Sequence, residues 1–325
     1  MAITKLSDVV SAASMSAFTN WFTKAYHDAS NFLKSGIAAT DSVIAARCAQ
    51  AGFSGKTVNM PFWGDLQGDD EVLSDTSDIS LNKIDADQDV AVITRRAKAF
   101  GITDLAVDLA GSDPMAWIAS RLGAYWARRD ETKVLATLRA IFTASTGAGK
   151  DLLLDASSAT LDKDTLLWAA QLLGDKKAEL TGIAMNSAAE AFLGSLDAKS
   201  TLYRGADQPG QLPSYNGRKI IMDDNLAYDS STHVAEIYLF GAGAVALNDV
   251  PSKTPLEAGR DPLKNGGEDY IVSRHANIAH VRGFAWKGTP AGATPTNVEL
   301  GTAANWAKVY DVKDIRVVKL LTRLS

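Results

Sequence analysis

Residues 65–89 read DLQGDDEVLSDTSDISLNKIDADQD, and by charge this stretch is the most informative part of the 325-residue chain. It contains nine acidic side chains and one basic one, Lys83, so its net charge is −8, whereas the whole chain carries −5. Apolar and polar residues alternate from Asp78 to Ile84, and Val90 to Thr94 is expected to form a second strand. The pattern predicts an extended, acidic two-stranded ribbon.

This acidic ribbon has two interpretations. A hairpin is at best marginally stable alone in water, and this one has few apolar groups with which to form a core. Composition alone favours a solvated loop. The alternative is an arm that becomes ordered on another surface, because a segment without its own core is stabilised only when a partner covers it.

The segments before the ribbon are expected to be helical and then extended. Aromatic and apolar groups at helical spacing predict a helix within residues 6–35, and a second helix is expected from Asp41 to Ala51. Thr57 to Trp63 is typical of a strand, and Pro61 inside it indicates an edge strand or a bulge.

The clearest helix follows the ribbon. Asp113 is suited to the N-cap and Pro114 to the first helical position. Apolar residues then recur three and four positions apart as far as Phe142, and Gly147 and Gly149 end the helix. A helix of about thirty residues spans roughly 45 Å. Its other face carries the arginines Arg121, Arg128, Arg129 and Arg139.

The rest of the chain mixes helices with strands, which is typical of an α/β lobe followed by sheet. Helices are expected at Lys163–Leu173 and Ala188–Leu196. Strands are expected at Gly182–Asn186, Lys219–Met222, Val234–Leu247, 270–287 and 306–322. Proline and glycine predict long loops at 248–269 and 288–297.

Composition excludes several classes of protein. The pI near 5.4 excludes a strongly basic nucleic-acid binder, and 46% hydrophobic with 22% charged residues is typical of folded chains. The length fits two domains or one multi-lobed subunit.

The sequence also indicates where the protein is located. The longest apolar run, Ile237 to Leu247, is too short to cross a bilayer, and Met1 to Ser11 lacks a secretory signal. We therefore expect a cytoplasmic location. The single cysteine, Cys48, excludes a disulfide framework.

Two glycine motifs are weak candidates for nucleotide binding. Gly241 and Gly243 fit a relaxed dinucleotide fingerprint, but the prolines that follow leave no room for the required helix, so small residues in a strand or tight turn are favoured. The segment from Gly147 to Lys150 follows a helix rather than a strand and lacks the hydroxyl residue of a phosphate loop. It is interpreted as a helix terminator.

Other chemical candidates also fail. Asp85, Asp87 and Asp89 have the spacing of the first calcium-loop ligands, yet the later glycine and glutamate positions are not matched. The histidines, His27, His233, His275 and His280, lack zinc-protease spacing, and the last two are expected to pack or to form hydrogen bonds. Cys48 is expected to be buried and structural. The sequence therefore indicates no enzyme, no cofactor and no metal site.

The order of these parts resembles the major capsid protein of tailed bacteriophages with the Hong Kong-type coat fold, over nearly the whole chain. The segments that carry the resemblance are Phe62–Gly64, the helix from Pro114, Ile183–Asn186, Gly217–Asp224, Tyr238–Val245, Arg274–Trp286 and Asn305–Thr322.

The resemblance implies an α+β fold in five parts. These are an N-terminal arm (1–56), a peripheral strand and extended loop (57–112), the spine helix of a peripheral domain (113–149), an axial α/β domain (150–250), and a loop with strands that return to the peripheral domain (251–325). The extended loop would lie over an adjacent subunit, at about residues 64–100.

The resemblance also implies a function and partners. Copies would self-assemble as hexamers and pentamers into an icosahedral head that encloses double-stranded DNA. The subunits would contact this DNA only non-specifically, and no membrane would be involved. Some relatives carry a fused N-terminal scaffolding segment. Because the hairpin of this chain already begins near residue 64, a separate scaffolding protein is expected instead. A portal and a decoration protein are expected as further partners. Assembly would occur in the host bacterial cytoplasm. A nanocompartment shell of the same fold and a small nucleotide-binding enzyme remain alternatives.

The assembly contacts are expected at charged and aromatic residues. We expect the acidic hairpin, through Asp69, Asp70 and Glu71, to dock across a neighbour's long helix at Arg121, Arg128 and Arg129, and the short basic group of residues 95–98 could also offset its charge. Trp63 lies at the exit into the hairpin. Some relatives join subunits through a Lys–Asn isopeptide bond, for which Lys83 is the only lysine in the acidic stretch.

Overall fold

The computed structural model describes residues 26, 30, 35–51, 55–64, 66, 68–73, 75, 78–79, 81–84, 86–110, 114–196, 203–204, 213–250, 252 and 254–324. Most of the helix expected within residues 6–35 lies outside this range. None of the described helices is long and apolar enough to span a membrane.

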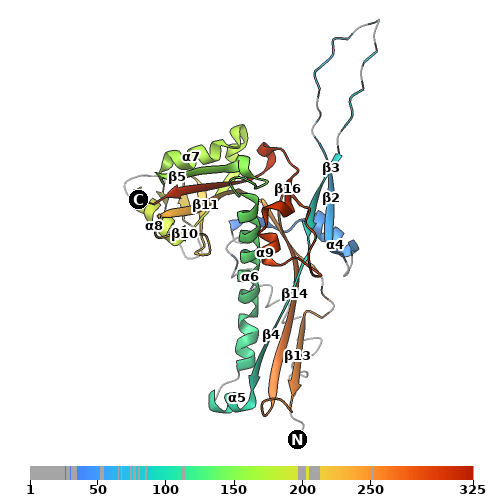
Figure 1. Cartoon of the computed structure of the whole chain (residues 1–325), viewed down its shortest axis with the longest axis vertical. Coiled ribbons are helices and arrows are strands. Elements are labelled where there is room, and N and C mark those ends of the chain that lie inside the picture. Colours follow the sequence, from blue (N-terminus) through green and yellow to red (C-terminus); the bar gives the residue numbers. More distant parts are fainter. Residues whose placement is uncertain are drawn as a thin grey trace.

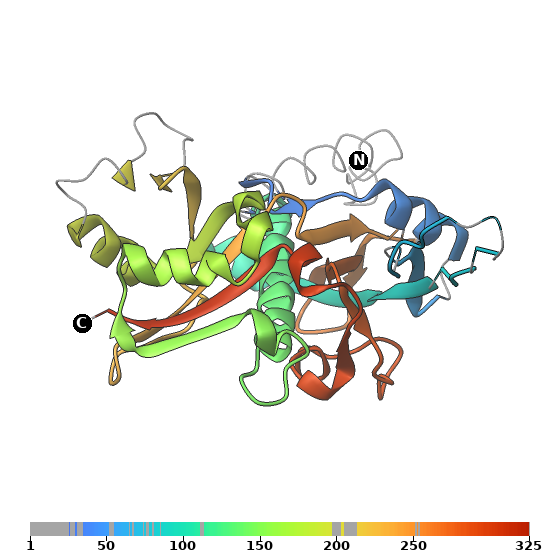
Figure 2. The same cartoon turned by 90° about the horizontal axis from the view of Figure 1, so that it is seen from above.

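A long helix stands between two sheets. Helix α6 (Pro114–Ile141) runs 28 residues, as the sequence predicts, but ends near Phe142, before the glycines. Figure 2 shows α6 nearly end-on, with one sheet on each side. Gly149 N donates to Ile141 O, so the glycines close the helix end.

The first sheet has five strands and is built around the long strand β14 (Glu268–Val281). Its other strands are β1 (Ala38–Ala39), β12 (Val245–Asp249), β13 (Leu256–Asp261) and β4 (Thr94–Thr103). Strand β4 leads into α5 (Asp104–Ala110) at the end of the molecule farthest from the eight-stranded sheet (Figure 1). The buried Trp126 on α6 donates a 2.9 Å hydrogen bond to Ser273 Oγ, which attaches the helix to β14.

The second sheet has eight strands. They are β5 (Leu153–Thr160), β17 (Val317–Arg323), β11 (Val234–Gly241), β6 (Leu180–Met185), β9 (Arg218–Met222), β8 (Ser214–Tyr215), β7 (Tyr203–Arg204) and β10 (Tyr228–Asp229). Helices α7 (Lys163–Gln171) and α8 (Ser187–Leu196) accompany this sheet. Asp162 and Thr165 form a capping box that starts α7.

Shorter elements complete the fold. They are α4 (Ser42–Ala51), β2 (Thr57–Trp63), β3 (Ala86–Val92), β15 (Phe284–Trp286), α9 (Asn297–Leu300), β16 (Trp306–Lys308), and the 3₁₀ turns η1 (Lys150–Leu152), η2 (Gly174–Glu179), η3 (Ala303–Asn305) and η4 (Val312–Asp314). Strands β2 and β3 pair as a separate antiparallel ribbon.

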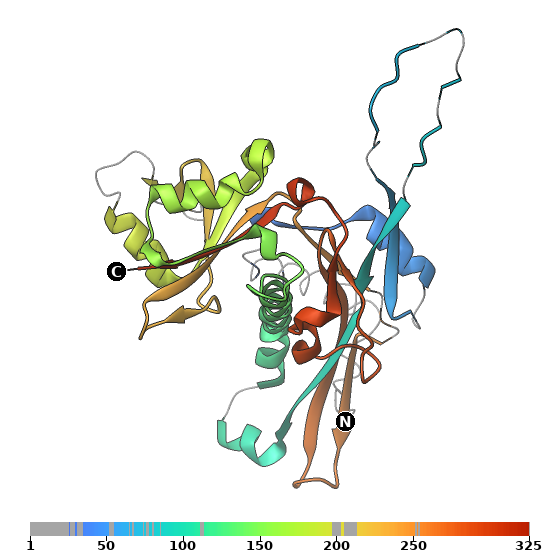
Figure 3. The same cartoon turned by 45° about the horizontal axis from the view of Figure 1, so that its top comes forward.

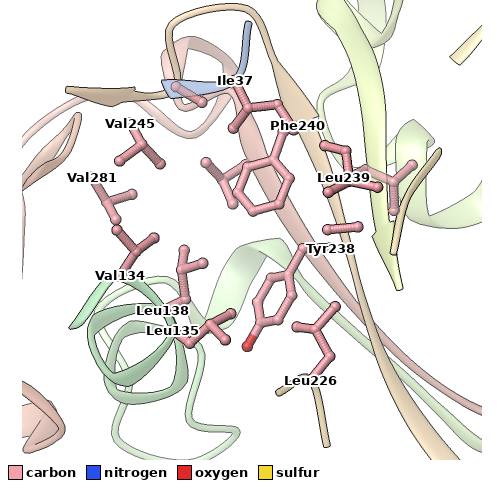
Figure 4. Close-up of a cluster of buried hydrophobic side chains, with 14 of the residues drawn as sticks. Ile37, Val134, Leu135, Leu138, Leu226, Tyr238, Leu239, Phe240, Val245 and Val281 are labelled. Carbon is pink, nitrogen blue, oxygen red and sulfur yellow. The ribbon is translucent and has the colours of Figure 1, made fainter. Parts of the chain in front are cut away.

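The main hydrophobic core joins the two sheets through α6. Leu135 and Leu138 of α6 belong to the same buried cluster as Tyr238 and Phe240 of β11 and Val281 of β14 (Figure 4). A smaller cluster, with Ile44, Cys48 and Ile93 among its members, lies under α4 and the ribbon. The sequence prediction of a buried Cys48 is confirmed.

One expected strand and one expected loop differ from the sequence prediction. The apolar run Val234–Leu247 is two strands in two sheets, because the chain turns at Gly243, whose φ is +66°. The expected loop at 248–269 contains β13, whose residues pair with β14 throughout.

The strands of residues 251–325, which are expected to return to the peripheral domain, divide between the two main sheets and a separate two-stranded sheet. Strand β17 lies in the eight-stranded sheet between β11 and β5. Its first four residues are all buried, as is typical of a strand covered on both faces in the centre of a sheet.

Candidate assembly surface

The acidic segment extends from a short ribbon and points away from the rest of the molecule (Figures 1 and 3). The ribbon pairs Thr57 with Val92 at its base and Trp63 with Ala86 at its outer end. Among the described residues of 64–85 there is no strand, so the strand expected from Asp78 to Ile84 is wrong. The two strands lie closer to the body than the sequence predicts, and Asp87 and Asp89 lie on β3. The other described acids of the stretch, Asp69, Asp70, Glu71, Asp75 and Asp78, belong to the segment beyond the strands, which we call the extended loop (64–85).

The extended loop exposes apolar as well as acidic side chains. Val72 is 95% exposed, Leu81 is 99% exposed and Trp63, at the start of the loop, is 76% exposed. The other large exposed apolar residues of the loop are Leu66, Leu73, Ile79 and Ile84. Asp69, Asp70, Glu71 and Lys83 are exposed as well. Exposed apolar groups gathered on one projecting segment indicate a surface that another molecule covers.

The middle of the ribbon, where Asp89 pairs with Met60, is fixed by a buried carboxylate. Asp89 Oδ2 accepts hydrogen bonds from His280 Nε2 at 2.9 Å and from Gly283 N at 3.1 Å. Phe62 makes an edge-on ring contact with Tyr310 at 4.7 Å between centroids. Asp89 therefore belongs to the body, and its inclusion in a solvated acidic stretch is wrong. The hydrogen-bonding role expected of His280 is confirmed.

The arginines of α6 divide into two groups. Arg121, Arg128 and Arg129 are exposed, and the Arg129 guanidinium lies 5.3 Å from the centre of the Tyr125 ring. Arg139 instead forms an ion pair with the buried Glu236 of β11, at 2.6 Å. Burial of Glu236 would raise its pKa, but the hydrogen bonds from Arg139 and Ala227 N and the charges of Lys319 and Arg139 together outweigh this effect, and the pKa is lowered.

A buried polar network, which the sequence analysis missed, fixes the middle of α6. Asp130 accepts from His275 at 2.8 Å and from the Tyr26 hydroxyl at 2.7 Å, and it lies 2.6 Å from Lys133. Burial would raise the pKa of Asp130, but the His275 hydrogen bond and the Lys133 charge hold it at about 2. The sequence signals for this network were weak. Asp130 and Lys133 are charged residues three positions apart on the apolar face of the helix. His275 was expected to pack or to form a hydrogen bond.

A cleft of about 450 Å³ opens beside this network, where α6, β4 and the start of α9 converge. Its lining includes Arg96, Tyr125, Trp126, Arg129, Lys133 and Asn297, and we call it the cationic cleft. Of these residues, the sequence indicated two as counter-charges for the acidic loop, namely Arg129 and, within the basic group of residues 95–98, Arg96.

The extended loop and helix α6 extend in different directions within one chain. The extended loop leaves the molecule on the side opposite the lower part of α6 (Figure 1). A contact between this loop and the arginines of α6 therefore needs a second molecule.

The remaining sequence candidates have structural roles. Gly241 ends β11, and β12 begins at Val245, so no helix follows the glycine motif. No group of three His, Cys, Asp or Glu side chains in the described part of the chain could hold a metal ion.

Comparisons with known proteins agree with one another. The family model described as "Major capsid protein 13-like" matches residues 15–316. The major capsid protein of Bacillus phage SPP1 is 38% identical over 332 aligned positions, which cover 100% of both chains.

Solved structures share the fold at low sequence identity. The capsid of cyanophage Pam1 has a TM-score of 0.55 and 12% identity, covering 83% of this chain and 85% of that one. The capsid of cyanophage P-SCSP1u has a TM-score of 0.53 and 13% identity, covering 84% and 85%. The head structure of Helicobacter pylori bacteriophage KHP40 has a TM-score of 0.52 and 12% identity, covering 83% and 84%. The chain thus has the α+β Hong Kong-type coat fold.

Proposed function

Since this chain belongs to the major capsid protein 13-like family and is a phage major capsid protein of the icosahedral head, we propose that the extended loop joins its copies by lying on a neighbouring subunit. The observation that carries the proposal is the exposure of the loop. Its apolar side chains have no core of their own among the described residues, and the loop projects away from helix α6 and the two main sheets (Figure 1).

Apolar contacts would supply most of the strength of this joint. Full burial of one Val, Leu or Ile side chain contributes about 1.5–3 kcal/mol, whereas one exposed ion pair contributes about 0.2–1 kcal/mol. Trp63, Val72 and Leu73 would therefore hold the loop on the neighbour. The pairs between Asp69, Asp70 or Glu71 and the arginines of α6 would set register and association rate.

The charge contribution can be tested by shell yield at different salt concentrations. We expect the D69N/D70N/E71Q variant to assemble more slowly than the wild type at low salt and to lose most of the salt dependence of assembly, because screening acts on exposed charges. The control is D108N/D164N, which removes two exposed acids from outside the loop. Unchanged yield and salt response in the loop variant would remove the charge argument.

The boundaries of the five parts are proposals for this chain. The five-stranded sheet with α6 would be the peripheral domain, and the eight-stranded sheet, including β17, the axial domain whose copies meet at the fivefold and sixfold axes. Residues 1–56 would be the N-terminal arm. Cryo-electron microscopy of assembled shells would test each boundary.

Further partners are also proposals. Capsid proteins of this fold form shells that contain many copies, and the contents here would be double-stranded DNA. Separate scaffolding, portal and decoration proteins would assemble with this chain. Mass spectrometry of purified heads and their precursors would identify them, and a nuclease-resistant DNA content would distinguish a phage head from an enzyme-filled compartment.

A further inference from the structure

Among the described residues, no carboxylate forms an ion pair with either of the two arginine side chains of the cationic cleft, although the charge of Glu299 favours the Arg96 cation. Arg96 donates only to neutral acceptors among the described residues, namely the carbonyl oxygens of Pro295 and of its own neighbour Arg95, Thr294 Oγ1 and Asn297 Oδ1. The described residues include no carboxylate within ion-pair distance of Arg129 either, whose guanidinium lies over Tyr125. Lys133, by contrast, is neutralised by Asp130.

The cleft combines this positive charge with aromatic walls. Tyr125 and Trp126 line it together with Arg96 and Arg129. Burial lowers the pKa of Arg96, and the charge of Glu299 opposes this shift only in part. A carboxylate that entered the cleft would find two guanidinium groups, whose planar donors match carboxylate geometry.

The extended loop offers the complementary surface. Asp69 and Asp70 are exposed, and the highly exposed Val72 and Leu73 follow within three positions. Acids directly followed by apolar side chains match a cleft that places cations beside aromatic rings. We propose that the cationic cleft of one copy receives the Asp69–Leu73 segment of a second copy. The proposal rests on the loop-mediated contact above and specifies the receiving site on the neighbour.

Substitutions inside and outside the cleft distinguish this site from the rest of α6. R129Q is the principal variant, because Arg129 is exposed and its only described partner is a ring. R96Q is the second, and R323Q is the matched control, because Arg323 is an exposed arginine that neither lines the cleft nor belongs to α6. We expect R129Q and R96Q each to raise the subunit concentration for half-maximal assembly by roughly twofold to fivefold. R323Q should stay at the wild-type value, and R129K should fall between.

Charge reversal gives the sharper test. D70R and R129E should each lower shell yield, and the D70R/R129E double variant should recover it, because each copy carries both halves of the contact. D70R/R323E should show no recovery. Urea unfolding of the unassembled subunits separates assembly defects from folding defects. If R96Q fails to fold, the assembly of R129Q and R129E still tests the proposal.

Four results would overturn the proposal. If D69N/D70N lowers assembly but R96Q and R129Q do not, the loop docks elsewhere and only this inference fails. If R128Q or R121Q lowers assembly instead, the receiving surface is the outer face of α6. If R129Q shells form at wild-type yield but retain less DNA, the occupant of the cleft is nucleic acid. If none of these variants, including D69N/D70N, changes assembly, the charge argument for the loop contact fails as well.

Discussion

His280 Nε2 lies 2.9 Å from Asp89 Oδ2, and both side chains are almost fully buried, so one hydrogen bond links the base of the extended loop to strand β14. The two residues are 191 positions apart. The direction in which the loop leaves the body therefore depends on this contact and on the Phe62–Tyr310 ring contact beside it.

Removing His280 should destabilise the subunit strongly. We expect H280A to lower the free energy of unfolding by about 3 kcal/mol, because it leaves a buried carboxylate with one remaining donor, Gly283 N. D87N changes an exposed acid on the same strand and should stay within about 0.5 kcal/mol of the wild type. Urea unfolding measures both, and an H280A value as small as that of D87N would contradict the proposed anchoring.

Asp130 should make stability depend on acid pH. Its pKa is about 2 in the folded chain against 3.8 in the reference state, so its stabilisation is present above about pH 4 and is lost as pH falls through 2. The loss should be about 2 kcal/mol. D130N should start less stable, because Lys133 then lacks its counter-ion, and should show a shallower decline between pH 5 and 2. Equal slopes in wild type and D130N would exclude this role.

The Arg139–Glu236 pair should couple α6 to the eight-stranded sheet. Glu236 is buried and also lies 3.3 Å from Lys319, so R139A leaves the carboxylate partly compensated. We expect R139A to cost about 1–3 kcal/mol and a double-mutant cycle with E236Q to give a coupling of about 1 kcal/mol or more. The matched control is R316A, whose partner Glu179 is half exposed, with an expected cost below about 1 kcal/mol. Thermal unfolding of the four variants reports the comparison.

The apolar side chains of the extended loop should affect assembly but not subunit stability. Trp63 and Leu73 are exposed in the single chain, so W63A and L73S should leave the unfolding midpoint unchanged and reduce shell yield at least tenfold when combined. V298S, at an exposed apolar position outside the loop, is the control. A lower unfolding midpoint in the loop variants would mean that the loop packs on its own chain.

Local patterns were sufficient for much of the fold. The 28-residue helix followed from apolar spacing of three and four, and α4, α7, α8, β2, β6 and β9 lie within a few residues of their predicted bounds. These predictions succeed because helix and strand periodicities are set by neighbours along the chain. The limits of the ribbon were predicted less well, since alternation at Asp78–Ile84 does not produce a strand without a partner strand beside it.

The sequence by itself determined that an acidic, partly apolar segment precedes a long arginine-bearing helix, because charge and periodicity are properties of consecutive residues. Only the tertiary structure decided that Asp89 is buried while Asp87 is exposed, that β17 joins the eight-stranded sheet, and that Arg96 and Arg129 share a cleft. These outcomes depend on contacts between residues more than thirty to nearly two hundred positions apart. Such contacts form only when the whole chain packs, and no local pattern encodes them.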